Sequence, residues 1–300
     1  MVDLSVVVVS PGRAADTLSR CLDALLPQAL ALGAEVLVVR HPGDGSCERV
    51  HAAHPEVAWV EAPAGDNVPR MRARAIRQAG GHTVALLEDD CVVAEGWVQG
   101  VLAVQEAGHA VAGGPIEPDL YLRGLDRAVF LCEYGRFMPP FHGEVMTLPG
   151  NNVSYRRRLV LDWLEARGEN GFLEVFAHRD WRAQGIRLWA DERIAVRHIG
   201  RWTRDTVTRA AFHHGRAFAG QRFEGGGASR TGSRLAFAVG SPLLPLLKTA
   251  RVAGEVFART GLAGSLLRAL PWIIVFHTSW AWGEMLGYLF GPGRSADRWL

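Results

Sequence analysis

Three consecutive carboxylates, Glu88, Asp89 and Asp90, follow the apolar run at residues 84–87. Four apolar residues in a row, rich in β-formers, predict a strand that is buried on both faces. Carboxylates are not buried without partners, so we expect these three where the strand leaves the sheet, in water or on a cation. Clustered carboxylates suit a hard divalent cation such as Mg²⁺ or Mn²⁺, which can also hold phosphates. An acidic surface turn after a strand would give the same local pattern.

A second polar cluster follows Pro149, where Gly150 leads into the adjacent Asn151 and Asn152. Two asparagines after Pro-Gly suit a turn whose side-chain amides are exposed. With the arginines at 156 and 157 they could hold hydroxyls or phosphates, although an ordinary turn has the same composition. Further along, His198 follows a short predicted strand, a position where a lone histidine is more often structural than a ligand.

The elements that must position these residues alternate between strand and helix. Strands are predicted at residues 4–9, 35–39, 56–60, 84–87, 109–113, 186–190 and 194–196. Helices are predicted from Asp16, from an Asn67 cap with Pro69 in the first turn, and from about Glu95. This alternation predicts an α/β fold, a mostly parallel sheet with helices on both faces. A G-x-G-x-x-G fingerprint after the first strand is absent, which argues against a nicotinamide oxidoreductase.

The composition sets broad limits on the class of protein. The 300 residues are 48% hydrophobic, enough for one large core or a domain with an appendage. The net charge of +2 indicates no nucleic-acid partner. The four cysteines are scattered without metal-ligand spacing, which is typical of reduced cytosolic thiols. The apolar run near the N-terminus lacks a basic region before it, so we read it as a first strand rather than a signal peptide.

The C-terminal part differs in character from the rest. After the glycines at 225–227 come two apolar segments, at residues 235–247 and 262–290. A membrane-spanning helix needs about 20 largely apolar residues, and the second segment is near that limit while the first is short of it. Tryptophans near the ends suit a membrane interface, whereas a helical cap or a dimer contact would use the same residues. We expect residues 234–290 to hold the protein on a membrane, with the preceding domain on the cytosolic side.

Taken in order and spacing, these pieces resemble the family 2 glycosyltransferases with a GT-A fold, over about residues 3–222. Residues 10–13 resemble the family's polar loop after the first strand, and residues 71–76 resemble its Ala-Arg-Asn helix. Residues 88–90 resemble its DXD-type motif, and residues 148–157 match its turn beside the acceptor site. The resemblance implies a GT-A-type sheet domain at 1–222 and an apolar, membrane-associated helical region at 223–300.

The resemblance also implies roles for particular residues. Donor binding falls to Pro11, Arg13, Asp44, Arg72, Glu88 and Asp89. Acceptor binding falls to Gly150, Asn151 and Asn152. Metal binding falls to Asp90 and His198. Counting back from Gly185 places the catalytic base at Glu174, with Asp180 as the alternative. Residues 40–46 depart from the family's Asp-Asp-Gly-Ser pattern, which leaves the donor base open, uridine in particular.

The expected function is therefore inverting transfer of a sugar from a nucleotide-diphosphate sugar to a hydroxyl. The expected cofactor is Mg²⁺ or Mn²⁺. The apolar C-terminus favours a lipid-linked acceptor or a cell-surface glycan precursor, with membrane lipid as a partner. A nucleotidyltransferase and a catalytically degenerate nucleotide-sugar-binding or scaffold protein remain as alternatives.

Overall fold

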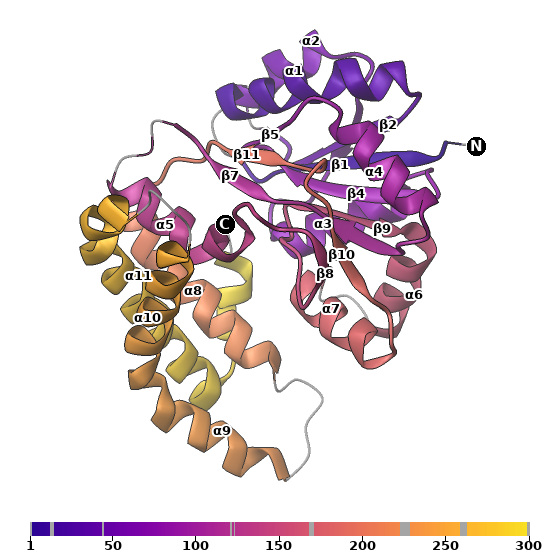
Figure 1. Cartoon of the computed structure of the whole chain (residues 1–300). Helices are drawn as coiled ribbons and strands as arrows, with labels where there is room; N and C mark the ends of the chain where they lie inside the picture. The colour runs from indigo at the N-terminus through magenta and orange to yellow at the C-terminus, as the bar shows by residue number, and fades with distance from the viewer. Residues whose placement is uncertain are drawn as a thin grey trace. The chain divides into compact units, whose positions relative to one another are not determined.

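The computed structural model describes residues 2–12, 15–43, 45–120, 122, 124–167, 171–222, 229–258 and 263–298. It divides into two compact units (Figure 1), of which the first comprises residues 1–119 and 137–200 and the second residues 120–136 and 201–300. Helix α8, Arg204–Arg222, belongs to the second unit. The division at 222/223 into a catalytic and a membrane-associated region stays a prediction, because a functional boundary need not follow compactness.

The first unit is built on an eight-stranded sheet in the order β3-β2-β1-β4-β9-β6-β10-β8. Six strands run in the same direction, and β8 and β9 run against them. The strands are β1 Leu4–Ser10, β2 Glu35–Arg40, β3 Ala58–Glu61, β4 Thr83–Glu88, β6 Val111–Gly113, β8 Gly143–Val145, β9 Asn152–Arg156 and β10 Leu188–Ala190. Every residue of β1 and β4 is buried, as expected of central parallel strands covered on both faces. The predicted α/β fold with a mostly parallel sheet is confirmed.

Helices cover both faces of this sheet, which runs between α1–α2 and α6–α7 in Figure 1. On one face α1 packs against α2 and α4, and on the other α3 packs against α6. Their bounds are α1 Ala15–Ala31, α2 Gly45–Ala53, α3 Val68–Gln78, α4 Trp97–Glu106, α6 Arg157–Arg167 and α7 Glu174–Ala183. Helix α3 begins as predicted, because the Asn67 side chain accepts a hydrogen bond from the Arg70 amide and Pro69 lies in the first turn.

A second, three-stranded sheet has the order β5-β11-β7. Its strands are β5 Cys91–Val93, β11 Val196–His198 and β7 Ile116–Pro118. Strand β5 follows directly on the acidic residues, and His198 is the register partner of Cys91. His198 is therefore the last residue of a strand, whereas the sequence had predicted that it follows one. This pairing joins residues about a hundred positions apart, which no local pattern reveals.

The second unit is helical in its described residues. Helices α5 and α8 both pack against α11, and glycines allow a close approach, since a Cβ on Gly283 would lie 2.0 Å from the Phe212 carbonyl oxygen. The bounds are α5 Gly124–Tyr134, α9 Ser229–Gly240, α10 Leu244–Phe257 and α11 Ala263–Phe290, with short 3-10 helices η1 Gly135–Phe137, η3 Ser241–Leu243 and η4 Gly293–Arg298.

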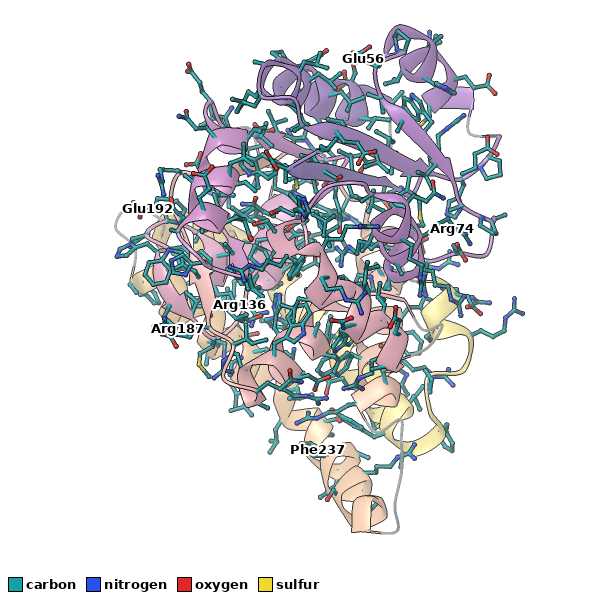
Figure 2. All side chains as sticks on the ribbon, turned by 90° about the vertical axis from the view of Figure 1, so that its right-hand side faces the viewer. Glu56, Arg74, Arg136, Arg187, Glu192 and Phe237 are labelled. Atoms are coloured by element: carbon teal, nitrogen blue, oxygen red, sulfur yellow. The ribbon has the colours of Figure 1, made fainter. Side chains whose placement is uncertain are left out.

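One helical stretch of the second unit, Gly232–Phe257, is long and apolar enough to cross a membrane, and only 17% of its most apolar window is buried. Side chains along this stretch, among them Phe237, project from the ribbon in Figure 2. The sequence had placed the longer apolar segment at 262–290, but no other described helix meets the criterion. Helix α11 instead buries Ile273 and Phe276 and carries the buried Glu284, which accepts a hydrogen bond from Tyr288.

Candidate functional site

The acidic residues lie at the carboxyl ends of β1 and β4, where the strand order changes direction along the sheet. Ligands of open α/β sheets bind at such positions. The Ser10 hydroxyl donates to Asp89 Oδ2 at 2.8 Å, and the Asp89 amide donates to the Val9 carbonyl. We expected these carboxylates to be exposed, and they are buried. The three-stranded sheet that begins at Cys91 and the partners described below account for the difference.

Asp90 and His198 face one another across the β5–β11 pair. His198 Nε2 lies 3.4 Å from Asp90 Oδ2, and each side chain is only 1% exposed. Gly200 leaves the room for this pair, since a Cβ there would lie 2.6 Å from both Asp90 Oδ2 and His198 Cε1. The two residues predicted to bind a metal are thus brought together, while that role stays a prediction.

Asp90 and His198 could supply part of a metal site. In the part of the chain that the structure describes, no group of three or more His, Cys, Asp or Glu side chains is gathered to hold an ion. A carboxylate and an imidazole on one side nevertheless suit Mg²⁺ or Mn²⁺, because such ions are commonly bound by one or two protein ligands together with substrate phosphates. Asp90 and His198 therefore fit a cation that is shared with a phosphate-bearing ligand.

Arg72 on α3 connects the acidic cluster to a second carboxylate far along the chain. Its Nη2 donates to Glu88 Oε1 at 2.8 Å and its Nη1 donates to Glu174 Oε2 at 2.7 Å. The guanidinium is buried, and a planar fork holds two carboxylates at a fixed separation in a way that an ammonium cannot. Glu174 reaches this position because Gly171, with φ +85°, packs directly against Pro69 at the start of α3.

One face of α7 holds the turn at 148–150. Glu174 and His178 are four residues apart on α7 and therefore share a face. A Cβ on Gly150 would lie 2.5 Å from Glu174 Cδ, so the carboxylate packs directly on the turn. His178 Nδ1 accepts a hydrogen bond from the Leu148 amide at 3.5 Å, and its Nε2 lies 3.0 Å from the Tyr155 hydroxyl oxygen. The predicted base and the predicted acceptor turn are in contact.

His178 stays neutral because burial lowers its pKa from 6.5 to about 3. A neutral ring has one acceptor nitrogen and one donor nitrogen; because Nδ1 accepts from the Leu148 amide, Nε2 carries the proton and faces the Tyr155 hydroxyl. The histidine is thus a structural support for the turn rather than an acid or base. The sequence analysis did not identify it, although its four-residue spacing from Glu174 was a usable signal.

Asp180, the alternative base, lies on another face of α7. It accepts hydrogen bonds from Trp163 Nε1 at 3.1 Å and from Arg167, both on α6. Burial alone would raise the pKa of Asp180, but these hydrogen bonds lower it on balance. Asp180 is therefore engaged with α6, whereas the carboxylate that contacts the turn at Gly150 is that of Glu174.

The two adjacent asparagines have different surroundings. The Asn152 amide is fully used inside the protein, since Oδ1 accepts from Trp97 and Nδ2 donates to the Pro115 and Ile194 carbonyls. A structural role therefore fits Asn152 better than acceptor binding. Asn151 is 2% exposed, and neither its Oδ1 nor its Nδ2 has a hydrogen-bond partner among the described residues. A buried amide without partners is costly, so Asn151 is suited to meet a ligand.

Of the remaining predicted donor residues, Arg13 and Asp44 lie outside the described residues, and Pro11 is half-buried in the turn after β1. Arg40, the last residue of β2, was not predicted as a site residue. Its side chain is buried beside His51 and Trp59. A charged residue closing an apolar strand run was the signal that could have marked it. All four cysteines are free thiols.

The chain is similar to known proteins both in sequence and in fold. Residues 5–161 match Glycosyl transferase family 2, and no protein of curated function matches significantly. Among solved structures 278 chains match significantly. One is described as the mannosyltransferase PcManGT from Pyrobaculum calidifontis in complex with GDP-Man and Mn²⁺, at 19% identity and a TM-score of 0.50, covering 96% of this chain and 85% of that one. At this identity the match shows a shared fold, and the predicted GT-A architecture agrees with it.

Proposed function

Because the chain belongs to glycosyl transferase family 2, we propose that it transfers a sugar from a nucleotide-diphosphate sugar to a hydroxyl acceptor with inversion at the anomeric carbon. One observation carries the proposal: the Glu174 carboxylate packs on Gly150 and is joined through Arg72 to Glu88 at the end of β4. A base, an acceptor turn and a donor-side acid are thereby held in one array.

In this reaction a bond forms between the acceptor oxygen and the anomeric carbon, while the bond from that carbon to the diphosphate oxygen breaks. Glu174 takes the proton of the acceptor hydroxyl, because its carboxylate contacts the acceptor turn at Gly150 while Arg72 holds it at Oε2. General bases act within hydrogen-bond reach of the proton that they remove. Asn151 orients the acceptor with its unpartnered amide, which lowers the barrier through positioning.

The donor lies over the carboxyl ends of β1 and β4. Glu88 and Asp89 are held there by Arg72 and Ser10, where they would orient the ribose or the metal. Asp90 and His198 would hold Mg²⁺ or Mn²⁺ beside the donor. When bound there, the cation would neutralise charge on the leaving diphosphate. Pro11, Arg13 and Asp44 complete the proposed donor site.

We also propose that the acceptor is lipid-linked or a cell-surface glycan precursor, and that the protein acts on the cytosolic side of a membrane. The support is the apolar stretch Gly232–Phe257, which is largely exposed in the chain itself. Membrane lipid would cover these side chains, either around a spanning helix or at the interface.

A catalytically degenerate binding protein is the second candidate, favoured by the altered residues 40–46 and by a glutamate at the base position. A nucleotidyltransferase shares the sheet and the acids, but only Gly12 and Arg13 stand where its glycine-rich basic loop would be.

Turnover separates these candidates. The purified full chain is first screened for melting-temperature increases with nucleotide diphosphates and Mn²⁺, since a ligand that binds the folded state stabilises it. Matching nucleotide sugars are then incubated with membrane extract, and release of the nucleotide diphosphate is measured. Binding without release would favour the degenerate protein. Release of pyrophosphate from a nucleoside triphosphate and sugar phosphate would favour the nucleotidyltransferase.

A further inference from the structure

Arg40, the last residue of β2, is a buried cation with an incomplete set of partners. Its side chain is 6% exposed. Nη2 lies 3.3 Å from His51 Nδ1, and the guanidinium carbon lies 5.5 Å from the centre of the Trp59 ring. Nε and Nη1 have no hydrogen-bond partner in the described part of the chain, and no described carboxylate pairs with the charge.

Such an arrangement is costly without a ligand. Buried charges are usually paired. A buried donor without a partner destabilises the folded protein by the full free energy of removing it from water. Each unsatisfied buried group in a folded protein calls for an explanation. Neither the fold nor the proposed catalytic array uses Arg40, because β2 is already anchored to β1 and β3 by its backbone.

The position of Arg40 relates it to the proposed donor site. Its register partner on β1 is Ser10, whose hydroxyl binds Asp89. Strands β2 and β4 are separated by β1, which puts their ends about 10 Å apart at ordinary strand spacing. If a cation bound by the acids after β4 holds the phosphates, a nucleotide that lies along this edge carries its ribose, and then its base, toward β2.

The chemistry of Arg40 selects among bases. A guanidinium offers only donors, in a fixed fork. Guanine presents two neighbouring acceptors, O6 and N7, on one edge, whereas adenine pairs N7 with an amino donor and uracil-type bases present a single acceptor on the corresponding edge. The rings of Trp59 and His51, with centroids 4.5 Å apart, add flat surfaces beside the fork. A phosphate also fits a guanidinium, but a phosphate contact would not distinguish one nucleotide base from another.

We propose that Arg40 recognises the base of the donor nucleotide and selects guanine through O6 and N7. This inference rests on the proposed nucleotide-sugar function and adds the donor class to it.

The test is calorimetry of the full chain in detergent with Mn²⁺ and five nucleotides: GDP, IDP, 7-deaza-GDP, ADP and UDP. IDP keeps O6 and N7 but lacks the amino group of guanine, so it should bind within about threefold of GDP. ADP, UDP and 7-deaza-GDP should bind at least roughly tenfold more weakly, which corresponds to the lower range for loss of a bidentate contact.

Two variants tie the preference to Arg40. Arg40→Met removes the donors at similar bulk, and Arg40→Lys keeps the charge but not the fork. In both, the five affinities should converge to within about threefold. Arg158→Met, at an exposed arginine paired with Asp162 on α6, should leave the preference unchanged. Melting temperatures verify folding, and removing an unpaired buried charge should not lower them.

The outcomes are distinguishable. Equal binding of all five nucleotides by the wild type, or preference for UDP, would overturn the assignment of guanine while leaving the nucleotide-sugar function standing. A guanine preference that survives in both Arg40 variants would also overturn it. No binding by any of the five would overturn the proposed function and this inference with it.

Discussion

The two units break the usual distribution of polar and apolar residues in opposite ways. The first buries charge: Asp89, Asp90, Glu88 and Arg72 are all almost fully enclosed. The second exposes apolar side chains along α9 and α10, with Leu246 71% exposed. Each departure costs stability when taken alone.

The two units differ in whether the chain itself supplies partners for these buried charges and exposed apolar side chains. The buried carboxylates find partners inside the first unit, in Ser10, Arg72 and His198. The exposed leucines of the second unit find none within the described chain. Departures from local rules cluster where function requires them. We infer that the first unit is organised around a small ligand, and that the second is organised around a surface the chain does not supply.

The largest effect is expected at Asp90. Asp90→Asn should abolish Mn²⁺-dependent binding of the nucleotide diphosphate, because it replaces the carboxylate beside His198 by a neutral amide. Calorimetry with and without Mn²⁺ measures this. Asp162→Asn, at an exposed helix position, serves as the control. Unchanged affinity in Asp90→Asn would remove Asp90 from the metal site.

Next comes the base. Glu174→Gln should lower kcat by at least about a hundredfold while keeping donor affinity close to that of the wild type, since Gln still accepts from Arg72. Initial rates at saturating donor measure this. Asp180→Asn, on another face of α7, should change kcat far less. If Asp180→Asn abolishes turnover and Glu174→Gln does not, the assignment is reversed.

In the second unit, Leu246→Glu should weaken sedimentation of the full chain with anionic lipid vesicles by about tenfold. Burying a leucine side chain is worth about 1.5–3 kcal/mol, and a charge there opposes insertion. Leu30→Glu, at a leucine 56% exposed on α1, is the matched control and should have no effect. A full chain that stays soluble and monomeric without detergent would end the membrane proposal.

The smallest effect concerns His178, whose pKa falls from 6.5 to about 3 on folding. The unfolded chain binds the proton more readily in this window, so stability is present above pH 6.5 and is lost as the pH falls. Between pH 6.5 and 5 this one group should cost about 1.5 kcal/mol. Urea unfolding at both pH values should show a smaller loss in His178→Gln than in the wild type. His142→Gln, at a histidine whose side chain is 69% exposed, should behave like the wild type.

The sequence predicted local features well where short-range chemistry decides them. The Asn67 cap, Pro69 in the first turn and the apolar run before Glu88 each act within a few residues. The roles of Glu174 and of the turn at Gly150 were predicted separately, from the resemblance to the family and not from any local rule. These predictions did not need the tertiary arrangement.

The missed features depend on distant partners. Asn152 reads as a turn residue, but it begins a central strand and uses its amide on Trp97, Pro115 and Ile194. The burial of Asp90 depends on β11, about a hundred residues later. Nothing near either residue in the chain announces these partners, so side chains that looked free for a ligand were already engaged.

Strand β9 sets the order in which this molecule can be completed during synthesis. It runs antiparallel between β4 and β6, and both neighbours precede it in the chain. Until residues 152–156 have left the ribosome, those two strands present unpaired edges, which are prone to pair with other chains. Helix α7 and its carboxylate emerge later still. The nascent chain therefore passes through a state in which the acidic end of β4 has been made but Glu174 has not, so the proposed catalytic array can assemble only after the sheet is closed.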